Sequence, residues 1–199
     1  LGDTETARSP IWTERSLARR FLTGQAPIKP TRAVAKSLGG TLNTAFLTIA
    51  AETASRDPVA MAAPADPLRA SMAVRTRTEQ SGSNAFSLVR LVAPTAEMPI
   101  DERFRAVQAA TAEATEQAAQ GAMEAIAALS VLLPTRLITR LARQQTQTVD
   151  FGTSNVKGSP IPIYAGGAKV IGTYPIGPTI GTSFNLTLLS YRKKLEMGL

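Results

Sequence analysis

The sequence predicts a mixed α/β (α+β) fold in which helices pack on one face of a mixed β-sheet. Helical spacing of apolar residues dominates the middle of the chain, whereas short strand patterns between Gly- and Pro-rich turns dominate from Thr148 onward. Apolar residues also occupy both faces of the stretch 85–92, which is typical of a central strand. Elements arranged in this order favour one sheet with helices layered against it.

The first 30 residues are polar and are interrupted by Pro10, Pro27 and Pro30. Prolines at this spacing break regular elements, so we expect a linker or strap that contains one short helix over 14–22. The domain itself is expected to occupy residues 31–199.

Two helices are predicted at the start of this domain. The first covers 31–38 and ends at Gly39-Gly40, because glycine is unfavourable within a helix. Thr41 is expected to cap the second helix. Helical spacing assigns the inward face of this second helix to Leu42, Ala45, Phe46 and Ile49.

Strands and one long Ala-rich helix are predicted in the remaining chain. Strand patterns cover 68–76 and 85–92, and a helix opens at Pro99-Ile100 with Asp101 as its expected cap. Its inner face is predicted to carry Phe104, Val107 and Thr111. The strands expected nearer the C-terminus are 149–155, 168–174, 184–191 and 195–199.

Composition excludes several kinds of chemistry. The 199 residues include no cysteine and no histidine, so the chain carries no thiol nucleophile, no imidazole base and no Cys- or His-ligated metal. Lys and Arg number 22 against 15 Asp and Glu, which gives a formal charge of +7. Such a charge favours an anionic partner, which is a nucleic acid, a lipid surface or a phosphorylated ligand.

Both ends of the sequence resemble cut ends. The chain opens at Leu1 without Met or a signal-peptide layout, and it stops in a strand pattern after Leu195. We therefore expect it to be a piece of a longer protein. Its best apolar run, 125–133, falls far short of the ~20 residues that span a bilayer.

One strand is predicted to end in three small hydrogen-bonding side chains, Thr153, Ser154 and Asn155. Such groups can orient a substrate or stabilise a developing oxyanion without changing their own protonation. The alternative is that Ser, Asn and the glycines around them build a turn and nothing more.

A basic helix is predicted after Pro134. Arg136, Arg140 and Arg143 recur at i, i+4 and i+7 beside a leucine-rich side, as in helices that lie on anionic membranes. An ordinary surface helix with its leucines in the core explains the same pattern. Binding to nucleic acid is not expected, because aromatic residues make up 5% of the chain and are scattered.

Four ordered blocks in the last third of the chain carry a family resemblance. They are Thr153–Val156, Tyr164–Val170, Tyr174–Pro178 and Phe184–Tyr191. This series closely resembles the C-terminal domain of the bacterial wax ester synthase/acyl-CoA:diacylglycerol acyltransferase (WS/DGAT) family. Upstream, Ala35–Asn43 resembles the family's helix that carries an Asn-Asp motif. The resemblance extends over nearly the whole chain from about Ser9 onward.

The resemblance implies a chloramphenicol-acetyltransferase-like fold, built from two similar α/β halves with the active site in a tunnel between them. It implies transfer of a fatty acyl group from coenzyme A to diacylglycerol or a long-chain alcohol. The family's catalytic motif, H-H-x-x-x-D-G, belongs to the N-terminal half, and its second His is the general base. A chain without histidine is then the C-terminal half, which is expected to be inactive alone, without catalytic residue, metal or cofactor, and with acyl-CoA as co-substrate.

Site residues follow from the resemblance at two places. Asn43 matches the Asn of the Asn-Asp motif and is expected to support the tunnel wall, but Thr44 stands where the family has Asp. Lys157 departs from the family's Pro-Gly-Pro turn, and it is a candidate for contact with a coenzyme A phosphate. A solvated turn lysine is the alternative.

The expected partners are the N-terminal catalytic half, acyl-CoA, and diacylglycerol or a fatty alcohol. The expected location is cytoplasmic, at the periphery of the inner membrane or of lipid inclusions, where Arg136, Arg140 and Arg143 are the candidates for contact with the surface. The alternative, from a different class, is a non-enzymatic module of the same fold that binds lipid or protein.

Overall fold

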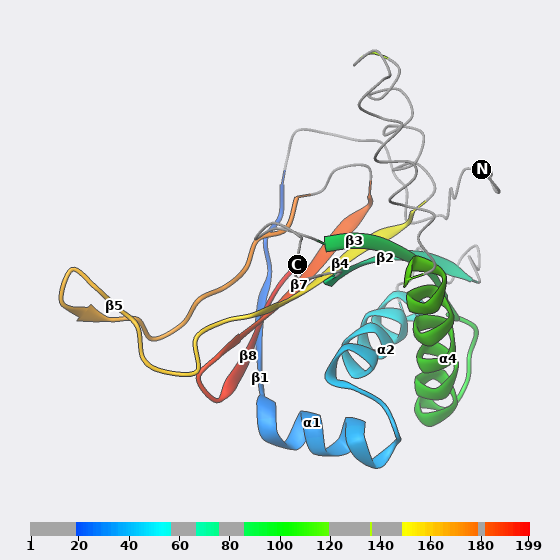
Figure 1. Ribbon diagram of the computed structural model, residues 1–199, viewed down its shortest axis with the longest axis horizontal. Helices are drawn as coiled ribbons and strands as arrows, with labels where there is room; N and C mark the ends of the chain where they lie inside the picture. Colours follow the sequence, from blue (N-terminus) through cyan, green and yellow to red (C-terminus); the bar gives the residue numbers. More distant parts are fainter. Residues whose placement is uncertain (1–18, 57–66, 76–85, 120–135, 137–148, 179–181) are drawn as a thin grey trace.

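A six-stranded mixed sheet forms the body of the protein, and helices α2 and α4 pack on one of its faces (Figure 1). The computed structural model describes residues 19–56, 67–75, 86–119, 136, 149–178 and 182–199. Across the sheet the strands follow the order β1 (Thr23–Pro27), β8 (Lys194–Gly198), β7 (Phe184–Tyr191), β4 (Phe151–Lys157), β2 (Leu68–Arg75) and β3 (Phe86–Ala93). The two central pairings, β7 with β4 and β4 with β2, are parallel, and the outer ones are antiparallel. The predicted mixed sheet is thereby confirmed.

The prediction that 85–92 forms a central strand is wrong. Strand β3 is the last strand of the sheet as far as the structure describes it, and it pairs with β2. Val89, Leu91 and Ala93 are buried under the helices, whereas Arg90 and Val92 are exposed on the other face. Over 89–93, buried and exposed residues alternate, as they do in a half-buried edge strand.

Helices α1 (Ile28–Ser37) and α2 (Leu42–Ser55) follow β1. Helix α1 begins three residues before its predicted start, because Pro30 falls in the first turn, where an N–H has no helical partner to lose. Thr41 caps α2 as predicted. The inward face of α2 is rotated from the predicted one: Ile49 is 51% exposed, and Leu47, Ala50, Ala51 and Ala54 are buried with Phe46.

Helix α4 (Ile100–Ala119) closes the same side of the sheet. Its predicted inner residues Phe104 and Val107 are buried. The prediction that Asp101 caps the helix is wrong. The helix begins at Ile100, so Asp101 lies inside the first turn, where its charge interacts favourably with the positive end of the helix dipole.

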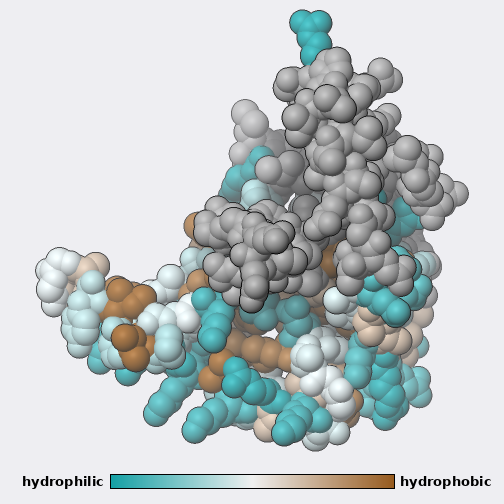
Figure 2. Space-filling model, viewed as in Figure 1, coloured by the Kyte–Doolittle hydropathy of each residue, from teal (hydrophilic) through white to brown (hydrophobic). Residues whose placement is uncertain are grey.

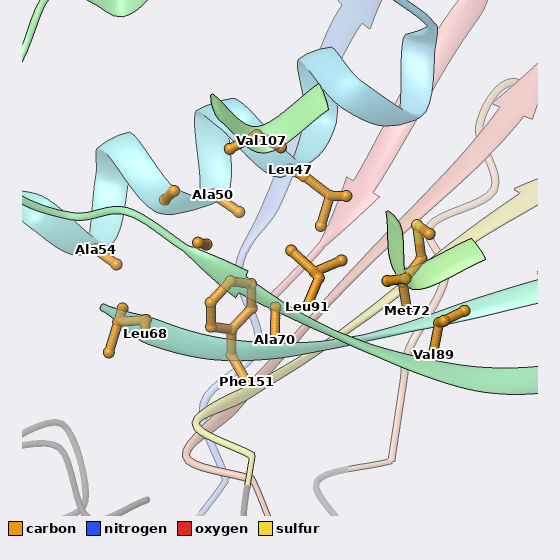
Figure 3. Packing of buried hydrophobic residues seen from close by; sticks show 13 residues of the cluster. Leu47, Ala50, Ala54, Leu68, Ala70, Met72, Val89, Leu91, Val107 and Phe151 are labelled. Atoms are coloured by element: carbon orange, nitrogen blue, oxygen red, sulfur yellow. The ribbon is translucent and has the colours of Figure 1, made fainter. Parts of the chain in front are cut away.

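The main core lies between these helices and the sheet. Figure 3 shows Leu47, Ala50 and Ala54 of α2 on one side, with Leu68 and Ala70 of β2 on the other. The rings of Phe151 in β4 and Phe184 in β7 stack with their centroids 4.9 Å apart, which adds a side-chain contact between these two paired strands. Small alanines on α2 let that helix approach the strands closely.

A long excursion leaves the sheet between β4 and β7. We call residues 158–178 the arm, and Figure 1 shows it projecting from the body. Of the predicted strand 168–174, only Ala168–Lys169 forms one, β6, which pairs with β5 (Tyr164–Ala165). Gly166 and Gly167 both have positive φ, as the two-residue turn of such a hairpin requires.

The N-terminal part of the described chain belongs to the sheet. Residues 19–22 are not helical, so the helix predicted over 14–22 is wrong there, and its remainder lies outside the described residues. Leu22 exchanges two backbone hydrogen bonds with Leu199, and β1 then pairs with β8. The sheet thus includes five residues of the expected strap, and the division between strap and domain stays a prediction.

A buried arginine joins three parts of the helical layer. The side chain of Arg103 on α4 is 2% exposed. Its Nε donates to Glu52 Oε2 of α2 at 2.8 Å, and its two terminal nitrogens donate to the carbonyls of Pro94 and Ala96. Every nitrogen of the guanidinium therefore has an acceptor, which is the condition for burying such a charge.

We expect the free energy of unfolding to fall below about pH 4.5, in part through Glu52. Desolvation opposes ionisation of Glu52, but the hydrogen bond from Arg56 and the charges of Arg103 and Arg56 outweigh it and hold the pKa below its ordinary value of 4.5. A lowered folded-state pKa contributes stability that is fully present above the unfolded-state pKa and is lost as the pH falls through the folded-state pKa. Urea unfolding between about pH 3.5 and about pH 7 is expected to show a smaller loss of stability at low pH for Glu52→Gln than for the parent. An identical pH profile for both proteins would contradict this assignment.

Candidate functional site

The structure brings two of the predicted site residues into contact. Asn43 lies in the first turn of α2, and Asn155 lies near the end of β4. The Asn155 Nδ2 donates to Asn43 Oδ1 at 3.0 Å, across 112 residues of sequence. Asn43 Nδ2 in turn donates to Met72 Sδ of β2 at 3.1 Å. The pair therefore joins the N-terminus of a helix to two neighbouring strands.

A capping box fixes the turn that carries Asn43. The Thr41 Oγ1 accepts from the Thr44 backbone N–H, and the Thr44 Oγ1 accepts from the Thr41 backbone N–H, each at 3.2 Å. Thr44 is buried, and its carbonyl accepts from the hydroxyl of Thr48. Thr44, the residue that departs from the expected Asn-Asp pair, thus takes the place that Glu or Gln holds in a capping box.

The three side chains expected at one strand end are divided between two faces of the sheet. Thr153 and Asn155 face α2, and the Thr153 hydroxyl donates to the Ser71 carbonyl at 3.0 Å. Ser154 points the opposite way, because side chains alternate along a strand, and it lies opposite Thr187 in the register of β7. Of the three, Asn155 alone is exposed.

Ser154 joins a polar group on the opposite face that the sequence did not indicate. The Thr187 hydroxyl donates to Asn185 Oδ1 at 2.9 Å, and Asn185 Nδ2 donates to the Pro178 carbonyl at 2.9 Å. Gly177 lies so close that a Cβ there would collide with Asn185 and Thr187. These contacts hold the end of the arm against β7, and Gly177 is the feature of the sequence that could have indicated them.

A buried carboxylate holds the arm at a second point. Glu196 of β8 is fully buried, and it accepts from the Thr173 backbone N–H and from Gln25 Nε2. Tyr191 adds a third point, because its hydroxyl donates to the Val170 carbonyl and accepts from the Ile163 N–H. The arm is therefore fixed at its base, while its apolar side chains project outward.

The cationic candidates lie at the surface or outside the described residues. Lys157 is exposed at the end of β4. Arg136 is helical and exposed, and Arg140 and Arg143 fall outside the described residues. The membrane role of the three arginines and the phosphate role of Lys157 stay predictions.

The described residues contain no group of three acidic side chains that is placed to hold a metal ion. Within the same part of the chain, no helix has the length and apolar character needed to cross a membrane. The Asn43–Asn155 pair also contains no group that titrates near neutral pH. Its chemistry is therefore limited to binding and orienting other groups.

The Asn155 amide is suited to holding a polar atom. An amide group offers two N–H donors and one carbonyl acceptor, and Asn43 occupies one donor. Within the described residues the other N–H and the carbonyl have no hydrogen-bond partner. A donor that a neighbour holds in place can stabilise a developing oxyanion or fix a substrate hydroxyl.

Comparison with known proteins adds independent information. The family model of the WS/DGAT C-terminal domain matches residues 82–199. Two proteins of Mycobacterium tuberculosis, provisionally named as diacylglycerol O-acyltransferases, are 28% identical over 184 residues and 33% identical over 203 residues. These alignments cover 92% and 95% of this chain but 37% and 43% of the relatives, so the chain spans about two fifths of their length.

Solved structures agree with this result. A wax ester synthase/diacylglycerol acyltransferase from Marinobacter aquaeolei VT8 superposes with a TM-score of 0.74 and 25% identity, over 97% of this chain and 45% of that one. The PapA2 acyl transferase superposes with a TM-score of 0.51 at 13% identity, over 90% of this chain and 38% of that one, and shows the fold alone. The acyltransferase fold expected from the sequence is therefore confirmed.

Proposed function

The chain belongs to the WS/DGAT acyltransferase family as a C-terminal domain, and from this we propose that it forms one half of an O-acyltransferase. The enzyme transfers a fatty acyl group from acyl-CoA to diacylglycerol, to a long-chain alcohol, or to both. The observation that carries the proposal is the Asn155 amide. One of its N–H groups donates to Asn43, and the other has no hydrogen-bond partner within the described residues. This half shapes the channel for the acyl chain and the acceptor, and it supplies no base.

The proposed reaction is a direct transfer. A histidine of the other half takes the proton of the acceptor hydroxyl, and the oxygen attacks the thioester carbonyl carbon. The carbon–sulfur bond then breaks, and the coenzyme A sulfur leaves and takes up that proton. In this scheme Asn155 donates to the oxygen on which negative charge develops, and Asn43 holds the amide in place.

The absence of histidine from the whole chain supports a division of labour between two halves. The apolar side chains of the arm provide the contact surface, because Ile161, Ile163 and Ile171 are all exposed, Ile171 to 86%. Figure 2 shows brown, hydrophobic patches on the projecting arm. We assign this apolar surface to the histidine-bearing half, which is then brought to the end of β4 where Asn155 lies.

The substrates determine where such an enzyme works. Diacylglycerol, fatty alcohols and their products partition into lipid, so we assign the enzyme to the periphery of the inner membrane or of lipid inclusions, on the cytoplasmic side. Acyl-CoA is the co-substrate, and no further cofactor is required. Lys157, exposed at the end of β4, is suited to a coenzyme A phosphate.

Acyl transfer from palmitoyl-CoA to diacylglycerol and to hexadecanol tests this function. We expect no product from the chain alone, and triacylglycerol or wax ester when an N-terminal half with the His-His motif is added as a separate chain. The Ile171→Ser variant is expected to lower activity of the mixture while leaving unfolding of this chain unchanged, since the side chain is exposed.

Two outcomes would contradict the proposal. Activity of the chain alone would mean that a group other than histidine is the base. A mixture whose two halves associate without acyl transfer would favour the alternative, a non-enzymatic module of the same fold that binds lipid or protein.

A further inference from the structure

Charge is unevenly distributed along this chain. Residues 15–51 and 151–195 contain no Asp or Glu, although the chain has 15 of them. In the described part, Glu52 and the acidic residues of 97–116 lie on or near α2 and α4, and Asp150 and Glu196 are buried. The cations of the two acid-free stretches are therefore not balanced by acidic neighbours in sequence.

The fold brings three cations from each of these stretches to one end of the molecule. Helix α1 starts against the β7–β8 turn, where the Ile28 N–H donates to the Lys193 carbonyl at 3.0 Å. We call the following six exposed side chains the cationic end: Lys29, Arg32 and Lys36 of α1, and Arg192, Lys193 and Lys194 of the turn. Figure 2 shows hydrophilic side chains along this lower edge, where Figure 1 shows α1 and the turn.

The geometry of α1 makes this end a continuous surface. Lys29, Arg32 and Lys36 stand at i, i+3 and i+7, so they share one face of the helix. Within the described residues none of the six forms an ion pair, and the Lys194 ammonium donates to the neutral amide of Gln25. The six charges are thus available to an external anion.

Arg192 provides an independent observation. Its φ is +56°, and among the described non-glycine residues no other φ is positive. This left-handed conformation favours glycine or asparagine, and an arginine adopts it at a cost in stability. Because Arg192 is exposed at the tip of a turn and its conformation costs stability, it points to a role other than folding.

We propose that the cationic end docks on an anionic lipid surface. Clustered Lys and Arg side chains bind acidic headgroups through charge, each adding a similar increment of affinity. The residues of α1 and the turn include no aromatic side chain on which nucleic-acid bases stack. The inference rests on the proposed function in one respect, because an enzyme with lipid-soluble acceptors must reach a lipid surface.

Flotation with vesicles of phosphatidylcholine, with and without about 30% phosphatidylglycerol, tests the proposal directly. We expect binding to the anionic vesicles alone, and release at ~0.5 M NaCl, because salt screens exposed charges. One triple variant neutralises the turn (Arg192→Asn, Lys193→Gln, Lys194→Gln), and another neutralises α1 (Lys29→Gln, Arg32→Gln, Lys36→Gln). Each should lower the partition coefficient about 100-fold, because each lost cation lowers it about fivefold.

A matched variant, Arg20→Gln, Arg56→Gln, Arg105→Gln, removes three charges from exposed positions outside the cationic end. We expect it to bind within about threefold of the parent. Equal loss in all three variants would overturn the proposal, since binding would then follow net charge alone. Loss in the matched variant only, or binding to duplex DNA and to neither vesicle, would also overturn it.

The single variant Arg192→Asn separates docking from folding. Asparagine tolerates the left-handed conformation, so we expect unchanged or higher thermal stability together with about fivefold weaker vesicle binding. Unchanged binding would overturn the role of the turn. Vesicle binding needs no acyl transfer, so the docking surface and the proposed reaction can fail independently.

Discussion

Replacing Arg103 by Met lowers the free energy of unfolding by about 2–3 kcal/mol. The change leaves the carbonyls of Pro94 and Ala96 without their donors and removes one of the two cations that Glu52 contacts. The arginine is buried while its acceptors are only partly so, and it makes three hydrogen bonds at once, so the loss exceeds that of a surface pair. Urea unfolding followed by circular dichroism measures the difference.

Arg105 supplies the control for this experiment. It lies on the same helix, pairs with Asp101 at 3.0 Å, and is largely exposed. Arg105→Met should therefore change the free energy of unfolding by less than about 0.5 kcal/mol. Arg103→Lys should fall between the two, because one ammonium cannot reach all three acceptors in the same planar arrangement. Equal losses for Arg103→Met and Arg105→Met would show that the buried hydrogen bonds contribute little.

Local sequence patterns predicted where helices and strands lie along the chain better than they predicted which elements pack against one another. Strand β7 forms over the predicted residues 184–191, and Thr41 caps α2, because alternation and capping depend on adjacent residues. The position of β3 at the sheet edge and the rotation of α2 depend on tertiary packing instead. An arginine in a helical pattern such as Arg103 indicates a solvent face, and its burial follows only from carbonyls that α4 meets after folding.

The candidate site illustrates the same limit. Asn43 was selected through a family resemblance and Asn155 from a run of small polar residues at a strand end. Their contact spans 112 residues, which no periodicity can indicate. Conversely, the run Thr153-Ser154-Asn155 suggested a cluster, but strand alternation separates Ser154 from its neighbours. Asn185 and Thr187 were missed because polar residues inside a strand pattern resemble ordinary exposed positions.

In the assembled enzyme, Asn155→Leu is expected to lower kcat/KM about 100-fold, which is the range found when one donor to an oxyanion is removed. The loss should appear in kcat more than in KM, because the charge develops only in the transition state. Ser154→Ala is the control, since this side chain lies on the other face of the sheet. Its activity should stay within about threefold of the parent, because a residue remote from the reacting atoms contributes little to transition-state stabilisation.

Asn43 is a positioning residue in this scheme, and its variant tests the contact itself. Asn43→Ala should lower kcat about tenfold, which corresponds to about one hydrogen bond. Because Asn43 acts through the Asn155 amide, the double variant should be no less active than Asn155→Leu alone. Additive losses would mean that the two asparagines act separately. If the loss of kcat is accompanied by a matching loss in the free energy of unfolding, the contact has a structural role and not a catalytic one.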